Sequence, residues 1–266
     1  MKLFSRLRHL PLLVFGLLVY LVALVLNFPA ERAYAHWKAS EQSSRTLALS
    51  SISGSVWSGK AGVALIQGQT LENIEWNIRP WSLLFGQVGL DWRFQLPAGS
   101  EKNGSYAQAK TSLGLDGSIE FSTLEARVPA STIAKLAQAG ALRPTGSVSL
   151  NLSDVVWDGQ NLVSANGRVV WHSAGITLLK PLPFGDQALT LETTDNVIKG
   201  VLKDSGGALS LDGIVTLNAE GKYEFNGSLA ARNAPNLERA LRSLGRPAAD
   251  GRIKLKQSGT LASLGI

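Results

Sequence analysis

Two hydrophobic patterns divide the chain. Residues 10–28 form one apolar run, LPLLVFGLLVYLVALVLNF, whereas much of the sequence after residue 46 alternates apolar and polar positions. At 1.5 Å of rise per residue, a helix of this uncharged run is long enough to cross a hydrocarbon core of about 30 Å. We therefore expect one transmembrane helix over residues 10–28. Its anchoring side chains include Leu10, Leu13, Leu17, Leu21, Leu24 and Phe28.

The charges beside this run predict its orientation. Lys2, Arg6 and Arg8 precede it, and no acidic residue does. Basic flanks stay on the cytoplasmic side of a membrane, so we expect residues 1–9 to be a cytoplasmic tail and the rest to be exported. Pro29 follows the run and helps to end the helix.

A cleaved signal peptide is the alternative interpretation of the N-terminus. Ala33, Tyr34 and Ala35 form an A-x-A sequence, which signal peptidases favour. The apolar run is longer than the usual signal-peptide core of about 7–15 residues, which favours an anchor. Both interpretations export the body. With an anchor, residues 29–46 become a linker, and Tyr34 and Trp37 would lie at the outer membrane interface.

The alternation after residue 46 has a period of two. Leu90, Trp92 and Phe94 are separated by polar residues, and segments 74–78, 148–152, 209–217 and 253–255 repeat this pattern. Such alternation is typical of strands with one buried face, so we predict an antiparallel all-β body of about 12–14 strands. Asx-Gly pairs favour tight hairpins. They occur at residues 103–104, 116–117, 166–167, 212–213 and 226–227.

Two short helices are expected within the β body. Segments 129–139 and 236–244 carry apolar residues on one helical face, begin beside a proline, and stop at Gly140 and Gly245. Each helix follows a similar sequence, GSIEF at residues 117–121 and GKYEF at residues 221–225, and precedes an Arg-Pro pair.

This similarity belongs to an internal repeat. Val-Trp-x-Gly at residues 56–59 recurs at 156–159, and a tryptophan-bearing strand follows each copy, with Trp76 and Trp171. We therefore predict two similar β modules, over residues 47–150 and 151–257, followed by a C-terminal tail at 258–266. Modules that cannot close their own apolar faces would join edge to edge into one curved sheet.

Several motifs together resemble the type II secretion system protein N family. They are GSVWSGKA at residues 54–61, segment 71–76, RPWSLLFG at 79–86, segment 146–152, WDG at 157–159, and GRVVW at 167–171 with Ala174. The resemblance covers the whole chain and rests mainly on glycines, tryptophans and their order. The residues that carry it are Gly54, Trp57, Gly59, Trp76, Pro80, Gly86, Trp157, Gly159, Gly167 and Trp171.

The resemblance implies a bacterial inner-membrane protein with a periplasmic β body. It implies a non-catalytic role in exporting folded proteins across the outer membrane, with other inner-membrane and periplasmic secretion components as partners. It supplies no catalytic residue.

The residues themselves offer little chemistry. The chain has no cysteine and three histidines, and it lacks HExxH, G-x-S-x-G, P-loop and G-x-G-x-x-G motifs, so we expect no enzyme activity, no metal site and no cofactor. Asp154 and Asp158 flank Trp157 and invite an acid–base interpretation, but a strand end and an Asp-Gly turn explain them better. The tail holds three of the 26 basic residues, which leaves 23 basic against 20 acidic residues elsewhere. These charges are dispersed, so we expect no nucleic-acid partner.

Other features leave alternatives open. Five of the six tryptophans of the β body, at positions 57, 76, 92, 157 and 171, are expected to fill the core rather than to line a ligand groove. Lys180 to Pro183 is expected to be a loop between strands, although an extended Pro-rich segment can also bind a partner. For function, the alternative to a secretion component is an AsmA-like envelope protein whose apolar β groove handles lipid.

Overall fold

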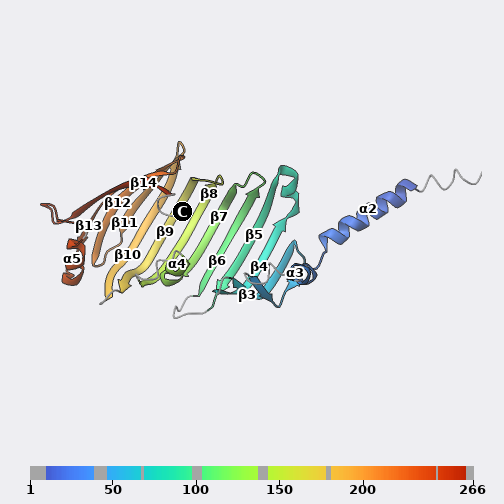
Figure 1. Ribbon diagram of the computed structural model, residues 1–266, viewed down its shortest axis with the longest axis horizontal. Helices are drawn as coiled ribbons and strands as arrows, with labels where there is room; N and C mark the ends of the chain where they lie inside the picture. The colour runs from blue at the N-terminus through green and yellow to red at the C-terminus, as the bar shows by residue number, and fades with distance from the viewer. Residues whose placement is uncertain are drawn as a thin grey trace, which may run out of the picture.

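A helical N-terminus leads into one extended antiparallel sheet (Figure 1). The computed structural model describes residues 10–38, 47–66, 69–97, 104–136, 143–177, 181–243 and 245–261. The basic residues Lys2, Arg6 and Arg8 of the predicted tail lie outside the described residues, as do Asn103, Gly140 and Lys180.

The N-terminal region contains two consecutive helices. Helix α2 spans Leu10–Leu26 and carries no charge, and helix α3 spans Ala30–Lys38. Across the described part of the chain, no helix is both long enough and apolar enough to cross a membrane. The sequence interpretation treated residues 29–46 as a linker and missed α3. Its signal was Glu31 in the first turn with His36 and Lys38 in the last turn, charges that complement the helix dipole.

Within the described residues, the sheet contains 14 strands. They are β1 Leu47–Ser50, β2 Ser53–Gly54, β3 Ser58–Ile66, β4 Gln69–Arg79, β5 Gln87–Leu96, β6 Ser105–Gly114, β7 Ile119–Pro129, β8 Pro144–Trp157, β9 Leu162–Thr177, β10 Pro181–Thr194, β11 Val197–Asp204, β12 Leu209–Asn218, β13 Lys222–Ala231 and β14 Ile253–Thr260. From β3 onward each strand pairs with the next along the chain, while β1 and the short β2 both pair with β3. The prediction of an antiparallel β body is confirmed.

In the part of the chain that the structure describes, helices interrupt this meander at three places. The 3-10 helix η1 spans Pro80–Phe85, between β4 and β5, and was not predicted. Helix α4 spans Ala130–Leu136 and helix α5 spans Pro235–Arg242, close to the two predicted segments. Strand β7 includes Pro129, so the first of these helices begins one residue later than predicted.

The Asx-Gly pairs were only partly interpreted correctly. Asp116-Gly117 does form the β6–β7 turn. The predicted hairpins at residues 166–167, 212–213 and 226–227 are wrong, because these pairs lie inside β9, β12 and β13. A Cβ on Gly213 or Gly227 would lie 2.8 or 2.6 Å from the ring of Phe225, and one on Gly167 would lie 2.2 Å from a main-chain oxygen. These glycines therefore permit close packing rather than turns.

The expected loop at residues 180–183 is also wrong in its described part. Pro181 to Pro183 form the start of β10, paired with the end of β9. The register shifts on both sides of Gly185, and such bulges let prolines be accommodated in a strand.

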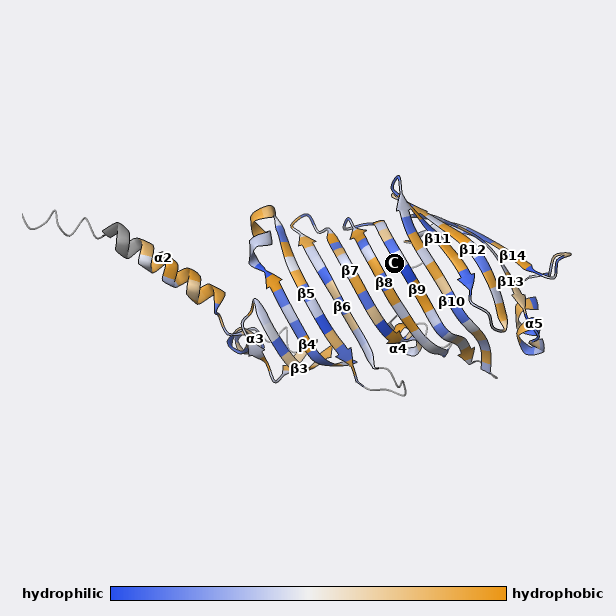
Figure 2. Ribbon diagram, turned by 180° about the vertical axis from the view of Figure 1, so that it is seen from behind, coloured by the Kyte–Doolittle hydropathy of each residue, from blue (hydrophilic) through white to orange (hydrophobic). Residues whose placement is uncertain are grey.

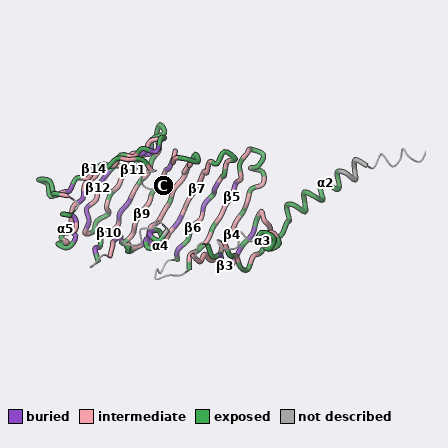
Figure 3. The backbone as a smooth tube through the Cα atoms, viewed as in Figure 1, coloured by how far each residue is buried: buried purple, intermediate pink, exposed green. Residues whose placement is uncertain are grey.

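The sheet is a single layer with buried positions along its length (Figure 3), and the two clusters of buried apolar residues lie in its C-terminal half. Leu237 and Leu241 of α5 pack against Leu209, Leu229 and Ile253 of β12, β13 and β14. A second cluster joins Ala165, Ile198 and Leu217. Among the described residues, no large side chain is completely buried. In both ribbon views the strands near α5 turn out of the plane of the central strands (Figures 1 and 2).

Candidate interaction surfaces

The first candidate surface is the joint between α2 and the sheet. The indole Nε1 of Trp57 donates a hydrogen bond of 2.9 Å to the carbonyl of Val25, in the last turn of α2. The amide of Val56 donates to the carbonyl of Phe28 at 3.0 Å. Two adjacent residues of the turn between β2 and β3 thus bind the end of the helix and the segment after it.

The family-motif residues build this turn. Gly54 has a φ of +90°, and a Cβ there would lie 2.5 Å from the carbonyl oxygen of Ser58. A Cβ on Gly59 would lie 2.4 Å from the ring of Trp76, which packs over it. The indole of Trp76 donates a hydrogen bond of 3.0 Å to the carbonyl of Val56. Glycine is therefore required at both positions for the two tryptophans to reach their acceptors.

The remaining motif residues lie at other points of the sheet. Pro80 begins η1, and Gly86 ends it in a left-handed conformation with φ +71°. In the second half, Trp157 ends β8, Gly159 lies in the following turn with φ +97°, and Gly167 and Trp171 lie in β9. Trp171 donates to the carbonyl of Thr145 at 2.8 Å. The structure therefore brings Gly54, Trp57, Gly59 and Trp76 together. The motif residues of the second half lie in other strands and turns of the sheet.

The anchoring residues chosen from sequence follow α2. Leu10, Leu13, Leu17, Leu21 and Leu24 lie in the helix, and Phe28 lies two residues beyond its end. The described side chains of α2 are exposed, including Phe15 at 66%, Leu17 at 58% and Tyr20 at 62%.

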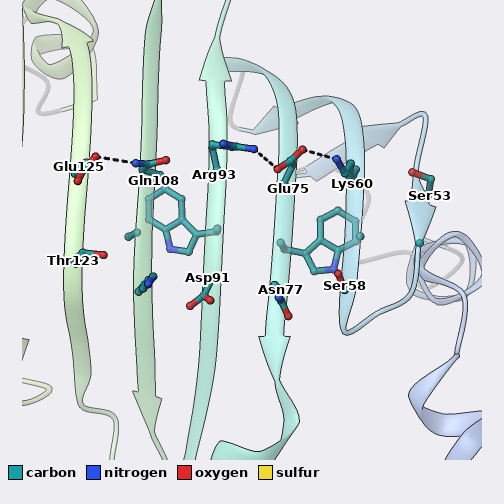
Figure 4. Close-up of a pocket in the computed structure, with 16 residues that line it drawn as sticks. Ser53, Ser58, Lys60, Glu75, Asn77, Asp91, Arg93, Gln108, Thr123 and Glu125 are labelled. Atoms are coloured by element: carbon teal, nitrogen blue, oxygen red, sulfur yellow. Dashed lines mark hydrogen bonds and ion pairs between the residues drawn. The ribbon is translucent and has the colours of Figure 1, made fainter.

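A second candidate surface is the polar face of strands β3 to β7. Directly opposed residues of an antiparallel sheet share a face. One such row crosses five strands, and Figure 4 shows ion pairs and hydrogen bonds that join its side chains in two separate groups. The row is Lys60, Glu75, Arg93, Gln108 and Glu125. These residues line an open groove of ≈ 550 Å³.

Pairing satisfies the charges of this row. Lys60 lies 2.8 Å from Glu75, and Arg93 also donates to the Glu75 carboxylate. Hydrogen bonds from Lys60 and then Arg93 lower the pKa of Glu75. Gln108 donates to Glu125 at 2.8 Å. The Glu75 carboxylate, held ionised in this way, is a poor proton donor at neutral pH.

The third candidate surface is the opposite, apolar face. One row of directly opposed residues runs across ten strands without a polar side chain. Its members are Phe94, Ala107, Ala126, Leu150, Val169, Leu189, Leu202, Gly213, Gly227 and Leu255. The neighbouring row begins with Trp76 and Trp92, continues through Leu124 and Leu152, and is equally apolar as far as Phe225.

Most of this apolar face is half-buried. Of its aromatic members, Trp92 stacks on Phe94 with ring centroids 5.4 Å apart. The large side chains of both rows are neither buried nor fully exposed, and Figure 2 shows hydrophobic and hydrophilic positions alternating along the strands. The tryptophans at 57, 76, 92, 157 and 171 are all half-buried, so they lie on surfaces of the sheet rather than in an enclosed core.

The polar residues weighed for catalysis have structural partners. The Asp158 carboxylate accepts hydrogen bonds from the amides of Gln160 and Asn161 at 2.8 and 2.7 Å, and these bonds lower the pKa of Asp158. Asp158 therefore forms the expected turn. Asp154 does not end a strand, because it lies inside β8 at a register shift, with φ +49°. His172 Nδ1 lies 3.4 Å from Asp186. Within the described ranges, no group of three or more potential ligands is arranged to hold a metal ion.

Sequence reasoning missed the contacts that make the joint. Val25 and Phe28 contribute main-chain carbonyls, which no side-chain pattern identifies. The polar row was also missed, although the alternation that predicted the strands places its members on one face.

Comparisons with known proteins agree with these motifs. A model of the family described as type II secretion system (T2SS), protein N, matches residues 45–256. The chain is 25% identical to the type II secretion system protein N of Aeromonas hydrophila over 252 residues, covering 92% of this chain and 96% of that protein. It is 24% identical to the protein of that name from Vibrio cholerae serotype O1 over 255 residues, covering 93% and 98%. The Pectobacterium carotovorum subsp. carotovorum protein of that name is 24% identical over 215 residues, covering 78% and 82%. No solved structure matches the chain.

Proposed function

Because the chain belongs to the type II secretion system protein N family, we propose that it is a membrane-tethered, non-catalytic component of the machinery that exports folded proteins across the outer membrane. The observation that carries this proposal is the joint, where Trp57 and Val56 bind the end of α2 and the segment after it. The motif that resembles the family thus connects the N-terminal helix to the sheet. A tether of this kind confines the sheet near partners in the same membrane and raises its effective concentration there.

In this proposal α2 is the anchor, in a single pass through the inner membrane. Helix α2 has 17 residues, which at 1.5 Å each span about 26 Å, and the uncharged run continues to Phe28. Exposed apolar side chains along α2 support burial in lipid, because each is stabilised on leaving water. The basic residues before the helix favour a cytoplasmic N-terminus and a periplasmic sheet.

The non-catalytic role follows from how the polar groups are used. Glu75 is neutralised by two cations, and Asp158 accepts main-chain hydrogen bonds in a turn. We propose that the partners are other inner-membrane and periplasmic components of the secretion system, and that neither nucleic acid, metal nor cofactor takes part.

Complementation of a deletion strain tests this function. We expect the deletion to retain folded secretion substrate in the periplasm. Single substitutions Asp154→Asn, Asp158→Asn and His172→Gln should restore release of the substrate to near the wild-type level. A folded, abundant variant among these three that blocked release would reveal an active site and refute the non-catalytic role.

We also propose that the sheet arose from two similar modules, over residues 47–150 and 151–257. Two strand–helix–strand units, β7–α4–β8 and β13–α5–β14, support this proposal, since each helix follows the strand of the repeated GxxEF sequence. The suggested boundary lies inside β8, which pairs with both β7 and β9, so the hydrogen-bond ladder continues through it.

Lipid handling is a second candidate function, favoured by the apolar face. A half-buried apolar row across ten strands offers an elongated surface for acyl chains. Mass spectrometry of lipids that co-purify with the protein distinguishes the two functions, with Leu150→Asp as a variant that places a charge in this row. A deletion strain that secreted normally but had altered outer-membrane lipids would place lipid handling first.

A further inference from the structure

Four apolar side chains at one end of the sheet are far more exposed than any others in the strands and turns that the structure describes. They are Trp81, Leu84 and Phe85 of η1, with exposures of 74%, 77% and 82%, and Leu115 of the β6–β7 turn, with 80%. The other exposed large apolar residues of the described sheet and its short helices range from 36% to 47%. We call these four residues the apolar tip.

Hydrogen bonds hold the apolar tip in place. The Ser82 hydroxyl donates to the carbonyl of Arg79 at 2.6 Å and accepts a bond from the amide of Gly89 at 2.7 Å. The amide of Leu115 donates to the carbonyl of Gly86 at 3.2 Å, which joins the two neighbouring turns. The exposure of the apolar tip is therefore a feature of a well-bonded structure, and large exposed apolar patches mark binding surfaces.

The apolar tip lies on the side of the sheet to which α2 is joined. The amide of Ile78 donates to the carbonyl of Trp57 at 2.6 Å, and the indole of the same tryptophan donates to the carbonyl of Val25. Pro80, the first residue of η1, follows Ile78 by two positions. Figures 1 and 2 show the β4–β5 connection on the side of the sheet nearest α2, and Figure 2 colours α2 and part of this connection hydrophobic.

From this geometry we propose that the apolar tip inserts into the outer interface of the same lipid bilayer that α2 enters. The inference rests on the proposed anchoring role of α2. Tryptophan favours the headgroup level of a bilayer, while phenylalanine and leucine favour the acyl boundary below it. One helix leaves the sheet free to rotate about the helix axis. A second membrane contact, made by the apolar tip, prevents this rotation and so fixes the orientation of the two faces of the sheet relative to the membrane.

The absence of cysteine from the chain allows a direct test by site-directed spin labelling. Three single-cysteine variants of the full-length protein, Phe85→Cys, Val25→Cys and Ile214→Cys, each carry one nitroxide. They are reconstituted into vesicles of phosphatidylethanolamine and phosphatidylglycerol. Collision rates with oxygen, which concentrates in lipid, and with a water-soluble nickel complex then report the environment of each label. Ile214 is the matched control, since it is exposed at 44% and lies in β12, far along the sheet from η1.

We expect the ratio of oxygen to nickel collisions at Phe85 to exceed that at Ile214 and to shift toward that at Val25. In the Phe85-labelled protein, Trp81→Ser with Leu84→Ser should return the ratio to the Ile214 value. The control pair Ile133→Ser with Val197→Ser, also exposed apolar residues, should leave it unchanged.

Three results would overturn the inference, and they separate its failure from that of the anchor. A water-exposed label at Phe85 with a lipid-exposed label at Val25 would reject the apolar tip and keep the anchor. Water exposure at both positions would reject both. A label at Phe85 that is shielded from both reagents would indicate a protein neighbour, such as a second copy of the chain, in place of lipid.

Discussion

The indole of Trp57 donates a hydrogen bond to the carbonyl of Val25, across 32 positions of the sequence. The last four carbonyls of a helix have no partner within it, and this side chain bonds one of them at the end of α2, a carbonyl that also accepts the amide of Phe28 at 3.3 Å. The amide of the preceding residue, Val56, binds the carbonyl of Phe28. The turn of the GSVWSGK motif therefore holds the N-terminal helix on the sheet.

Removing the indole donor should loosen this joint. We expect Trp57→Phe, which keeps an aromatic ring, to cost about 1 kcal/mol of local stability, the usual net value of one hydrogen bond. Hydrogen exchange at the Val56 amide, which bonds to the neighbouring carbonyl of Phe28, should accelerate by roughly fivefold. The matched control is Trp157→Phe at the repeated motif. Equal exchange at Val56 in both variants and the wild type would show that the bond does not secure the joint.

The strands could be predicted from sequence because their signal is local. Alternation at residues 90–94 places Trp92 and Phe94 on one face, and the structure stacks their rings there. The uncharged run likewise predicted a helix over residues 10–28, and α2 spans Leu10–Leu26, two residues short of the predicted end. The alternation of a strand follows directly from backbone geometry, and an uncharged run of this length favours a helix.

The joint could not be predicted, because its acceptors are main-chain carbonyls that any residue supplies. Gly213 and Gly227 were misinterpreted for a related reason. An Asx-Gly pair favours a turn locally, but here the glycines make room for the ring of Phe225, a residue that becomes their neighbour only when β12 and β13 pair. Tertiary packing thus overrides the turn signal. A single sequence does not show whether an Asx-Gly pair forms a turn or makes room for a neighbouring side chain.

The packing of Phe225 over glycine gives a stability prediction. A Cβ on Gly213 would lie 2.8 Å from the Phe225 ring, so Gly213→Ala should force a shift that costs about 1–3 kcal/mol. Urea denaturation followed by circular dichroism measures this loss. In a Phe225→Leu background the same substitution should cost clearly less, because the ring has been removed. An equal cost in both backgrounds would mean that the strain arises elsewhere.

The ion pair between Asp204 and Arg232 predicts a dependence of stability on pH. The Asp204 side chain is 10% exposed, and the hydrogen bond from Arg232 lowers its pKa from 3.8 to about 2. A carboxylate with a lowered folded-state pKa stabilises the fold above the unfolded-state value, and this stabilisation is lost as the pH falls from about 4 toward 2. The contribution should be about 1–2 kcal/mol, since the exposed arginine is screened by solvent.

Urea denaturation between pH 5 and pH 2 tests whether the stabilisation by Asp204 decreases as the pH falls. The difference in unfolding free energy between wild type and Asp204→Asn should shrink as the pH falls through this window. Asp154→Asn is the control, because Asp154 is exposed and asparagine tolerates its positive φ. A difference that stayed constant down to pH 2 would show that Asp204 does not titrate with folding.

The central claim is that the sheet acts in secretion while tethered to the inner membrane by its N-terminal helix. The most direct measurement is the amount of folded substrate released by a deletion strain that produces one of three chains at equal levels. These are the wild type, a chain with residues 10–26 replaced by an unrelated single-pass helix, and the exported body alone, released from a cleaved signal sequence. The account predicts that the first two restore release and that the free body does not. Full restoration by the free body would contradict it, because the sheet would then act without a tether.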